Sequence, residues 1–241
     1  MARLELDRVT VRYGGLEALR EVSFAVEPGS LVALVGPNGA GKTTVFDVVS
    51  GLVRPTSGAV RLDGRDLAGR PAHHVAALGV GRTFQIARLF PGLPALDNVL
   101  VGVTFGARPA ESAAERRRHA WRLLEVVGLE SRATAPAATL SLGEQKRLEL
   151  AVALAPEPRL LLLDELASGL PPRGRTEVVR FYARLRERGL TVVAIEHALG
   201  VLGELADRVV VLDQGAVVAD GPPGAVLALP RVVEAYLGDA D

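Results

Sequence analysis

One glycine-rich segment near the amino terminus has the residue types and spacing of a phosphate-binding loop. It fits the pattern G-x-x-x-x-G-K-[ST] and consists of Gly36, Pro37, Asn38, Gly39, Ala40, Gly41, Lys42, Thr43 and Thr44. Glycines let successive backbone N–H groups turn toward a phosphate, and the start of a helix adds partial positive charge. Lys42 can neutralise β- and γ-phosphate oxygens, and the Thr43 hydroxyl can bind Mg²⁺. The segment predicts a nucleoside triphosphate site.

Two carboxylates follow a run of four leucines. Asp164 and Glu165 come directly after residues 160–163, which read as a fully buried strand. A carboxylate at the end of such a strand is costly unless a cation or hydrogen bonds satisfy it. Asp164 suits a Mg²⁺ ligand, whereas Glu165, which points elsewhere, suits a base that polarises an attacking water. With the phosphate loop, the pair predicts hydrolysis of the nucleotide.

Gln85 and His197 are polar residues that follow the segments 80–84 and 191–195. A histidine in such a position is more often a satisfied structural residue, and a glutamine at a strand end usually faces solvent. Neither residue carries a function by itself.

The elements that must position these residues follow from apolar periodicity. Alternation predicts antiparallel strands at 4–13 and 22–26, and short apolar runs predict buried strands at 31–35, 160–163, 191–195 and 209–212. Helical patterns cover 43–52, 113–127, 143–155 and 177–188, with two short helices in 222–238. Strand, helix and strand in series indicate a parallel α/β sheet.

The composition excludes several classes of protein. Lys and Arg total 28 and Asp and Glu total 28, so no overall field attracts nucleic acid or anionic lipid, and phosphate affinity must be local. The absence of cysteine excludes disulfides and thiolate metal sites. No apolar stretch approaches the roughly 18–20 residues that span a bilayer, and we see no secretory signal. We therefore expect a chain retained inside the cell. Its mean hydropathy of +0.25 fits either a sheet buried on both faces or a docking surface.

Residues 140–145 read Leu-Ser-Leu-Gly-Glu-Gln and precede the two carboxylates. This segment resembles the signature of ABC-transporter ATPases, and with it six motifs follow the order of that family over essentially the whole chain. The resemblance implies an α/β P-loop NTPase fold, the ABC cassette, with a RecA-like parallel-sheet core, an antiparallel β subdomain and an inserted helical subdomain. We expect a single domain, residues 1–241. Residues 1–93 and 156–241 would form the core with the antiparallel lobe, and 94–155 the helical subdomain.

The resemblance also implies roles. The cofactors are ATP and Mg²⁺, with 36–44 as the Walker A loop and Tyr13 stacked on adenine. The residues around the metal are Thr43, Gln85 and Asp164. The catalytic set is Lys42, Gln85, the base Glu165 and the switch histidine His197. The signature residues that contact nucleotide held by a second cassette are Ser141, Gly143, Glu144 and Gln145.

Within the family, the segments 82–85, 88–93 and 97–102 are similar to the LivG-like type, the ATPases of branched-chain amino-acid importers. This implies a cytoplasmic subunit on the inner face of the cell membrane that pairs with a second cassette, as a homodimer or heterodimer. It contacts membrane only through permease subunits, which dock on 90–93, and binds no nucleic acid. The alternatives are the ATPase of another ABC system, such as a lipid or lipopolysaccharide exporter, a non-transport ABC ATPase, and a non-hydrolysing subunit.

Three positions depart from the family's pattern. Leu142 stands where the signature usually has glycine, and we expect an ordinary negative φ there. Leu166 replaces the usual proline after the glutamate. Pro171 stands where the D-loop normally has aspartate or asparagine, so communication between two paired sites should differ, while the hydrolytic residues are intact.

Overall fold

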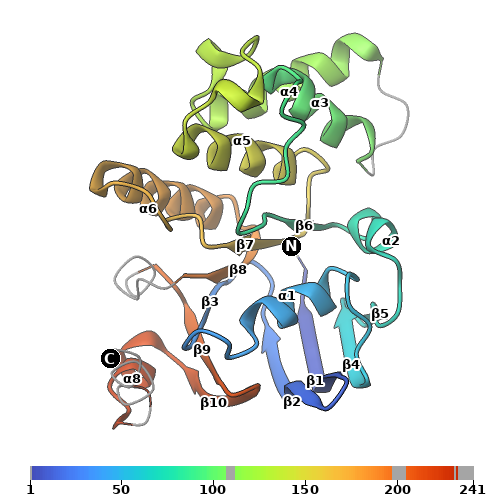
Figure 1. Cartoon of the computed structure of the whole chain (residues 1–241), viewed down its shortest axis with the longest axis vertical. Helices are drawn as coiled ribbons and strands as arrows, with labels where there is room; N and C mark the ends of the chain where they lie inside the picture. Colours follow the sequence, from blue (N-terminus) through green and yellow to red (C-terminus); the bar gives the residue numbers. More distant parts are fainter. Residues whose placement is uncertain (1, 107–111, 197–204, 231, 233–241) are drawn as a thin grey trace.

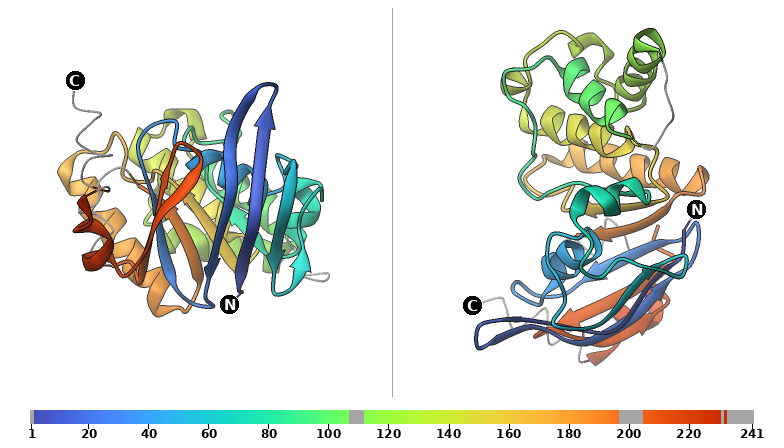
Figure 2. Two further views of the ribbon diagram at one scale, coloured as in Figure 1. Left: turned by 90° about the horizontal axis from the view of Figure 1, so that it is seen from below. Right: turned by 90° about the vertical axis from the view of Figure 1, so that its right-hand side faces the viewer.

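The computed structural model describes residues 2–106, 112–196, 205–230 and 232. Two sheets lie toward one end of the molecule and a group of helices forms a lobe at the other (Figures 1 and 2). One edge of the larger sheet lies next to the helical lobe (Figure 1). The strand that leads into the phosphate loop lies further from the lobe than this edge does.

Six strands form the larger sheet, in the order β10-β9-β3-β8-β7-β6. The pairs from β9 to β6 are parallel, and β10 is antiparallel to β9. The strands are β3 (Leu31–Val35), β6 (Val80–Arg82), β7 (Leu160–Asp164), β8 (Thr191–Ile195), β9 (Arg208–Asp213) and β10 (Ala216–Gly221). Every residue of β3, β7 and β8 is buried, which explains their unbroken apolar runs.

Strand β3 illustrates how the two faces of this sheet are used. Its odd-numbered residues, such as Ala33, pack in the core that contains the helical lobe, whereas Val32 and Leu34 pack in a second core with the smaller sheet. Helix α1 (Lys42–Val49) contributes the fully buried Phe46 to the second core. The phosphate loop is thereby fixed at both ends by buried elements.

The smaller sheet is antiparallel, in the order β2-β1-β4-β5. Its strands are β1 (Leu4–Tyr13), β2 (Leu16–Val26), β4 (Ser57–Leu62) and β5 (Arg65–Asp66). Strand β1 ends at Tyr13, so this sheet carries that aromatic side chain toward the start of α1.

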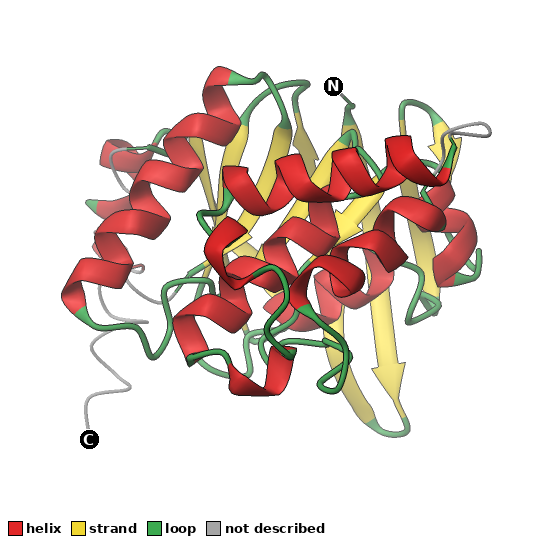
Figure 3. Ribbon diagram, turned by 90° about the horizontal axis from the view of Figure 1, so that it is seen from above, coloured by secondary structure: helices red, strands yellow, loops and turns green. Residues whose placement is uncertain are grey.

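Helices cover the other face of the parallel sheet (Figure 3). The helical lobe holds α3 (Ala95–Thr104), α4 (Ala113–Val126), α5 (Leu142–Leu154) and the short 3₁₀ helices η1 (Glu130–Arg132) and η2 (Ala137–Thr139). Outside this lobe, the described part of the chain also forms α2 (Ala72–Ala77), α6 (Pro172–Glu187) and α8 (Pro223–Leu227). In the part of the chain described here, no helix has the length and apolarity needed to cross a membrane.

The strands expected at 4–13, 31–35 and 191–195 have these bounds, and 22–26 proves to be the end of the longer β2. The helix expected at 43–52 ends earlier, because Gly51 has a left-handed φ of 73°. The helix expected at 177–188 begins five residues sooner, with proline in its first turn. Strands β4, β5 and β10 were not predicted, and of the two helices expected in 222–238 the part after 232 lies outside the described residues.

The entry to the phosphate loop generates a stability prediction. Gly36 has φ 148°, and a Cβ there would lie 2.0 Å from the Leu212 carbonyl oxygen. We expect Gly36→Ala to lower the free energy of unfolding by roughly 3 kcal/mol or more, measured by urea denaturation. The matched control is Gly64→Ala, whose φ is 75° but whose Cβ would meet nothing within 4 Å. It should cost only about 1–2 kcal/mol. Equal losses would contradict the steric argument.

Candidate functional site

The phosphate loop connects the buried strand β3 to the first turn of α1. Gly41 precedes the helix with φ 100°, and no described side chain caps the helix or adds an acid to its first turn. Lys42 is 7% exposed, and its Nζ donates to the carbonyl oxygens of Gly36 (2.6 Å) and Pro37 (2.7 Å). The loop therefore encloses an ammonium group beside uncapped helix N–H groups, an arrangement that favours an anion.

Tyr13 lies against this loop at the end of β1. Its side chain is half exposed, and its pKa is raised by desolvation and by the Asp47 carboxylate, while a hydrogen bond with Thr44 opposes the shift. The aromatic residue and the phosphate loop, far apart in sequence, are thus neighbours.

Asp164 is the most constrained acid of the site. It is 3% exposed at the end of β7, and its backbone N–H donates to the buried Thr83 hydroxyl oxygen at 3.0 Å. Its pKa is raised to about 6, chiefly by burial, with smaller contributions from the neighbouring Glu165 and Asp47, while Arg82 and Lys42 act in the opposite direction. The carboxylate is therefore expensive to keep ionised without an added cation.

Arg82 is a buried cation that sequence reasoning used only as a marker of the family branch. Its Nη1 bonds Asp47 Oδ1 at 2.7 Å, and its Nη2 lies 3.8 Å from Asp164 Oδ2. The guanidinium carbon lies 5.6 Å from the centre of the Phe46 ring and 4.7 Å from that of Phe84. The available signal was an arginine within an apolar segment just before Gln85. Arg82 therefore links Asp164, at the end of β7, to Asp47 of α1.

Glu165 and Gln85, predicted separately, meet in the structure. Gln85 Nε2 lies 3.3 Å from Glu165 Oε2. Glu165 is 7% exposed and has a left-handed φ of 49°, which is uncommon for a residue with a Cβ. Its N–H donates to the Ile195 carbonyl at 2.9 Å, and its carbonyl accepts from Lys146 Nζ at 2.7 Å. Strained backbone held from both sides is typical of functional positions.

His197 lies outside the described residues. The preceding Glu196 is buried and accepts hydrogen bonds from the Ala167 N–H (3.1 Å) and the Tyr182 hydroxyl (2.9 Å). Burial raises the Glu196 pKa. These two hydrogen bonds therefore hold Glu196 in place at the end of β8, directly before His197 in the sequence.

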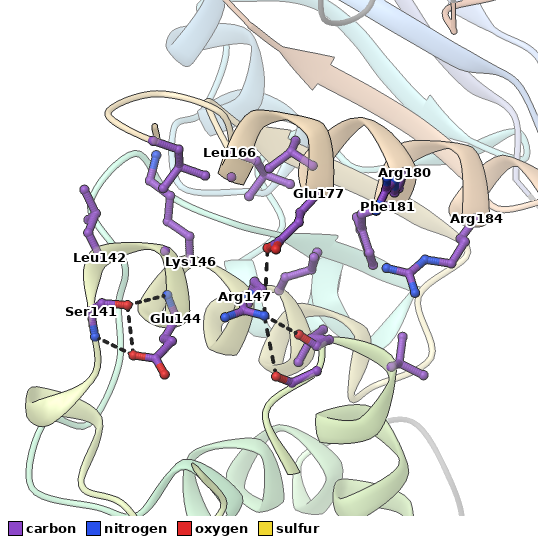
Figure 4. A pocket seen from close by; sticks show the side chains of 18 of the residues that line it. Ser141, Leu142, Glu144, Lys146, Arg147, Leu166, Glu177, Arg180, Phe181 and Arg184 are labelled. Carbon is purple, nitrogen blue, oxygen red and sulfur yellow. Dashed lines mark hydrogen bonds and ion pairs between the residues drawn. The ribbon is translucent and has the colours of Figure 1, made fainter. Parts of the chain in front are cut away.

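The signature segment starts α5 in the helical lobe. Ser141 and Glu144 form a capping box, in which the Glu144 N–H donates to Ser141 Oγ and the Ser141 N–H and hydroxyl both lie 2.8 Å from Glu144 Oε2 (Figure 4). These hydrogen bonds lower the pKa of Glu144. Gln145 is half-buried, and its Nε2 donates to the Leu140 carbonyl at 2.9 Å. Leu142 is 53% exposed and lacks a positive φ, as expected.

The signature and the phosphate loop do not meet within the described chain. Helix α5 lies in the helical lobe, whereas α1 lies across the sheet edge (Figures 1 and 2). A pocket of about 840 Å³ opens between α5 and α6, and Ser141 and Gly143 line it, but the phosphate loop does not. This pocket is thus on the signature side, and Asp164 does not line it.

The described residues contain no group of three or more His, Cys, Asp or Glu placed to hold a metal. Hard oxygen donors suited to Mg²⁺ are nevertheless present in Thr43, Gln85 and the costly buried carboxylate of Asp164. This donor set fits a metal that takes its other ligands from phosphates and water.

A phosphate loop between a parallel strand and a helix, with an acidic residue at the end of another parallel strand, defines the class of P-loop nucleoside triphosphatases. Residues 19–168 match the ABC transporter family. The chain belongs to this family of ABC ATPases, which implies nucleotide binding and ATP hydrolysis.

Relatives and solved structures agree with this membership. The chain is 42% identical to the high-affinity branched-chain amino acid transport ATP-binding protein BraF of Pseudomonas aeruginosa, covering 98% of each chain. It is 38% identical to LivG of Escherichia coli over 98% of each chain. An ATP-binding cassette of an ABC transporter in its ADP conformation has a TM-score of 0.89 and 27% identity over 99% of this chain and all of the other. A dimeric cassette bound to ADP and Pi has a TM-score of 0.83 and 30% identity over 91% and 98%. The predicted family and fold class are confirmed.

The buried charge of Asp164 generates a pH-dependent prediction. Because the Asp164 pKa is raised from 3.8 to about 6, the folded chain still holds a proton on this carboxyl between these two pH values, whereas the unfolded chain has released it. Stability of the nucleotide-free chain should therefore fall as pH rises from about 4 to 6, then level off. Asp164→Asn removes this cost, so at pH 7.5 it should be more stable than wild type by up to roughly 3 kcal/mol.

Urea denaturation at pH 4 and pH 7.5 measures this difference. The gain should largely vanish at pH 4, where the wild-type carboxyl is protonated. A less stable Asp164→Asn chain at pH 7.5 would show that Arg82 and Lys42 more than compensate the charge.

Proposed function

We propose that this chain is the ATP-hydrolysing subunit of an ABC importer that transports branched-chain or other hydrophobic amino acids. The observation that carries the hydrolytic part is the contact of Gln85 with Glu165 beside the buried Asp164. The transport part is supported by relatives named as branched-chain amino acid transport ATP-binding proteins, which match along nearly the full chain. These relatives give no similar support to a lipopolysaccharide exporter or a non-transport ATPase.

Hydrolysis would use the site's residues in distinct roles. Lys42 would exchange its two loop carbonyls for phosphate oxygens, and the N–H groups at the start of α1 would bind the same phosphates. Glu165 would orient and deprotonate the attacking water, with Gln85 fixing the position of its carboxylate. His197 would contact the γ-phosphate, and Tyr13 would stack on adenine.

Thr43, Gln85 and Asp164 are the residues that would hold Mg²⁺. Bound there, the metal would neutralise charge that develops on the β- and γ-phosphate oxygens. Asp164 would be held ionised by that cation, which opposes the effect of its burial.

A second cassette would complete each site. Ser141, Gly143, Glu144 and Gln145 belong to the start of α5, across the sheet edge from their own phosphate loop (Figure 1). Head-to-tail pairing would bring this helix start to the γ-phosphate held by the partner chain. The dimeric cassette structures among the similar proteins support this pairing. Pro171 would leave the D-loop contact without its usual carboxylate.

A permease would dock on the segment between β6 and α3. Three large apolar side chains are exposed there, Ile86 (84%), Phe90 (53%) and Leu93 (39%). The buried Asn98 of α3 holds this segment, because its side chain accepts from the Phe90 N–H at 2.8 Å and donates to nearby backbone carbonyls, including that of Leu93. The subunit would thereby be peripheral on the cytoplasmic face, with membrane contact only through its partner.

The proposed base generates a direct test of hydrolysis. Glu165→Gln should lower the steady-state ATPase rate of the purified chain roughly a hundredfold or more while ATP still binds, because the amide cannot accept the water proton. Chelation of Mg²⁺ should abolish the wild-type rate. Glu130→Gln, an exposed glutamate of the helical lobe, is the matched control and should hydrolyse normally. A wild-type rate in Glu165→Gln would reject the assignment of the base.

The docking segment generates a second test. Ile86→Glu or Phe90→Glu should abolish copurification with a polytopic membrane protein from detergent-solubilised host membranes, because a buried interface would gain an unpaired charge. Phe105→Glu is the control, since Phe105 is 84% exposed at the end of α3, outside the proposed surface. If all three variants copurify equally, the permease binds elsewhere.

A further inference from the structure

Helix α5 carries two charged residues that face inward rather than toward solvent. Lys146 is 9% exposed and Glu149, one turn further along, is 4% exposed. They lie behind the signature residues, on the side of the helix that packs toward the parallel sheet. Buried charges need partners, and the partners of these two identify what the helix holds.

Glu149 holds the segment that contains Gln85. Its Oε1 accepts hydrogen bonds from the backbone N–H groups of Phe84 and Arg88, each at 3.1 Å. The Arg88 guanidinium carbon also lies 4.0 Å from the centre of the Phe84 ring. One carboxylate oxygen therefore fixes the backbone on both sides of Gln85.

Lys146 holds the turn that contains Glu165. Its Nζ donates to the carbonyl oxygens of Glu165 and Ser168, both at 2.7 Å. Figure 4 shows this side chain reaching from α5 toward the loop that precedes α6. Because Glu165 has a left-handed φ and its N–H is fixed by Ile195, Lys146 supplies the second restraint on a strained residue.

Neighbouring groups offset the burial of the two charges only in part. Burial lowers the pKa of Lys146, and the carboxylates of Glu196, Glu165, Glu149 and Asp164 oppose that shift. Burial raises the pKa of Glu149, whereas its hydrogen bonds from Arg88 and Phe84 oppose the change. An apolar pair would fill the same space without this electrostatic cost. The hydrogen bonds to two separate loops therefore distinguish the pair from simple core filling.

We propose that Lys146 and Glu149 are positioning residues, through which the signature helix sets the backbone of the Glu165 turn and of the Gln85 segment together. Any rotation of the helical lobe then moves both side chains as one unit. The proposal rests on the function proposed above, in which Glu165 and Gln85 serve hydrolysis.

Glu149 variants separate positioning from packing. Glu149→Met removes the acceptor but keeps the buried volume, whereas Glu149→Gln retains an oxygen able to accept both N–H groups. We expect Glu149→Met to lower kcat roughly ten- to a hundredfold with KM for ATP changed less than about twofold, and Glu149→Gln to keep most of kcat. If Glu149→Met does not fold, Glu149→Asp, which is too short to keep both bonds, should show the same split to a smaller degree. Equal losses of kcat and of ATP affinity in Glu149→Met and Glu149→Gln, or a wild-type kcat in Glu149→Met and Glu149→Asp, would overturn the proposal.

Lys146 and a double-mutant cycle supply the second arm. Lys146→Met should lower kcat as Glu149→Met does, and Lys146→Arg should restore much of it. Glu130→Ala, the exposed control in the same lobe, should change neither parameter. If Glu149 acts through Gln85, then Gln85→Ala with Glu149→Met should be no slower than the slower single variant. Additive losses would show that Glu149 acts elsewhere.

Hydrogen exchange tests the same geometry without any activity. The amides of Phe84 and Arg88 should exchange faster in Glu149→Met, and that of Glu165 faster in Lys146→Met, while amides within α1 keep their wild-type protection. A wild-type chain that hydrolyses no ATP would remove the proposed function, yet these amides would still report the restraints. Unchanged exchange at all three amides would overturn the positioning roles.

Discussion

The carboxylate of Asp164 ends a strand that is buried on both faces, and the surrounding site is arranged around the cost of that buried charge. Arg82 approaches from one side, Thr83 accepts the backbone N–H, and Lys42 adds positive potential from the phosphate loop. These groups do not remove the cost, because burial still raises the Asp164 pKa to about 6. A site of this kind gains stability from a bound cation, which links ligand binding to the state of the carboxylate.

The larger sheet brings this chemistry together because the carboxyl ends of its parallel strands lie along the same side of the sheet. Strand β3 leads into the phosphate loop, β7 into the two acids, and β6 into the segment with Gln85. The helical lobe contacts this site through two inward-facing side chains of α5. Glu149 accepts a hydrogen bond from the segment after Gln85, and Lys146 donates one to the Glu165 carbonyl. The signature at the start of the same helix lines a pocket that its own phosphate loop does not line. One helix therefore connects the surface proposed to meet a second cassette with the interior of the site.

The local parts of the site could be predicted because strand, turn and helix are adjacent in sequence. The phosphate loop and the strand of four leucines both have short-range signals, whereas the capping role of Ser141 was not predicted. Strands β4 and β10 could not be predicted, since they are only partly buried and show no continuous apolar run, and β5 has only two residues, both exposed. Arg82 was read as a family marker because nothing in its immediate sequence reveals that Asp47 and Asp164 flank it.

The sequence by itself determined the family, the phosphate loop and the acidic pair, because each depends on residue types at fixed spacing within one segment. Only the tertiary structure decided that Gln85 contacts Glu165, and that Lys146 and Glu149 hold the two loops that carry them. These contacts join segments up to 80 positions apart. Their partners are set by how α5 packs on the sheet edge, and no local pattern encodes that packing.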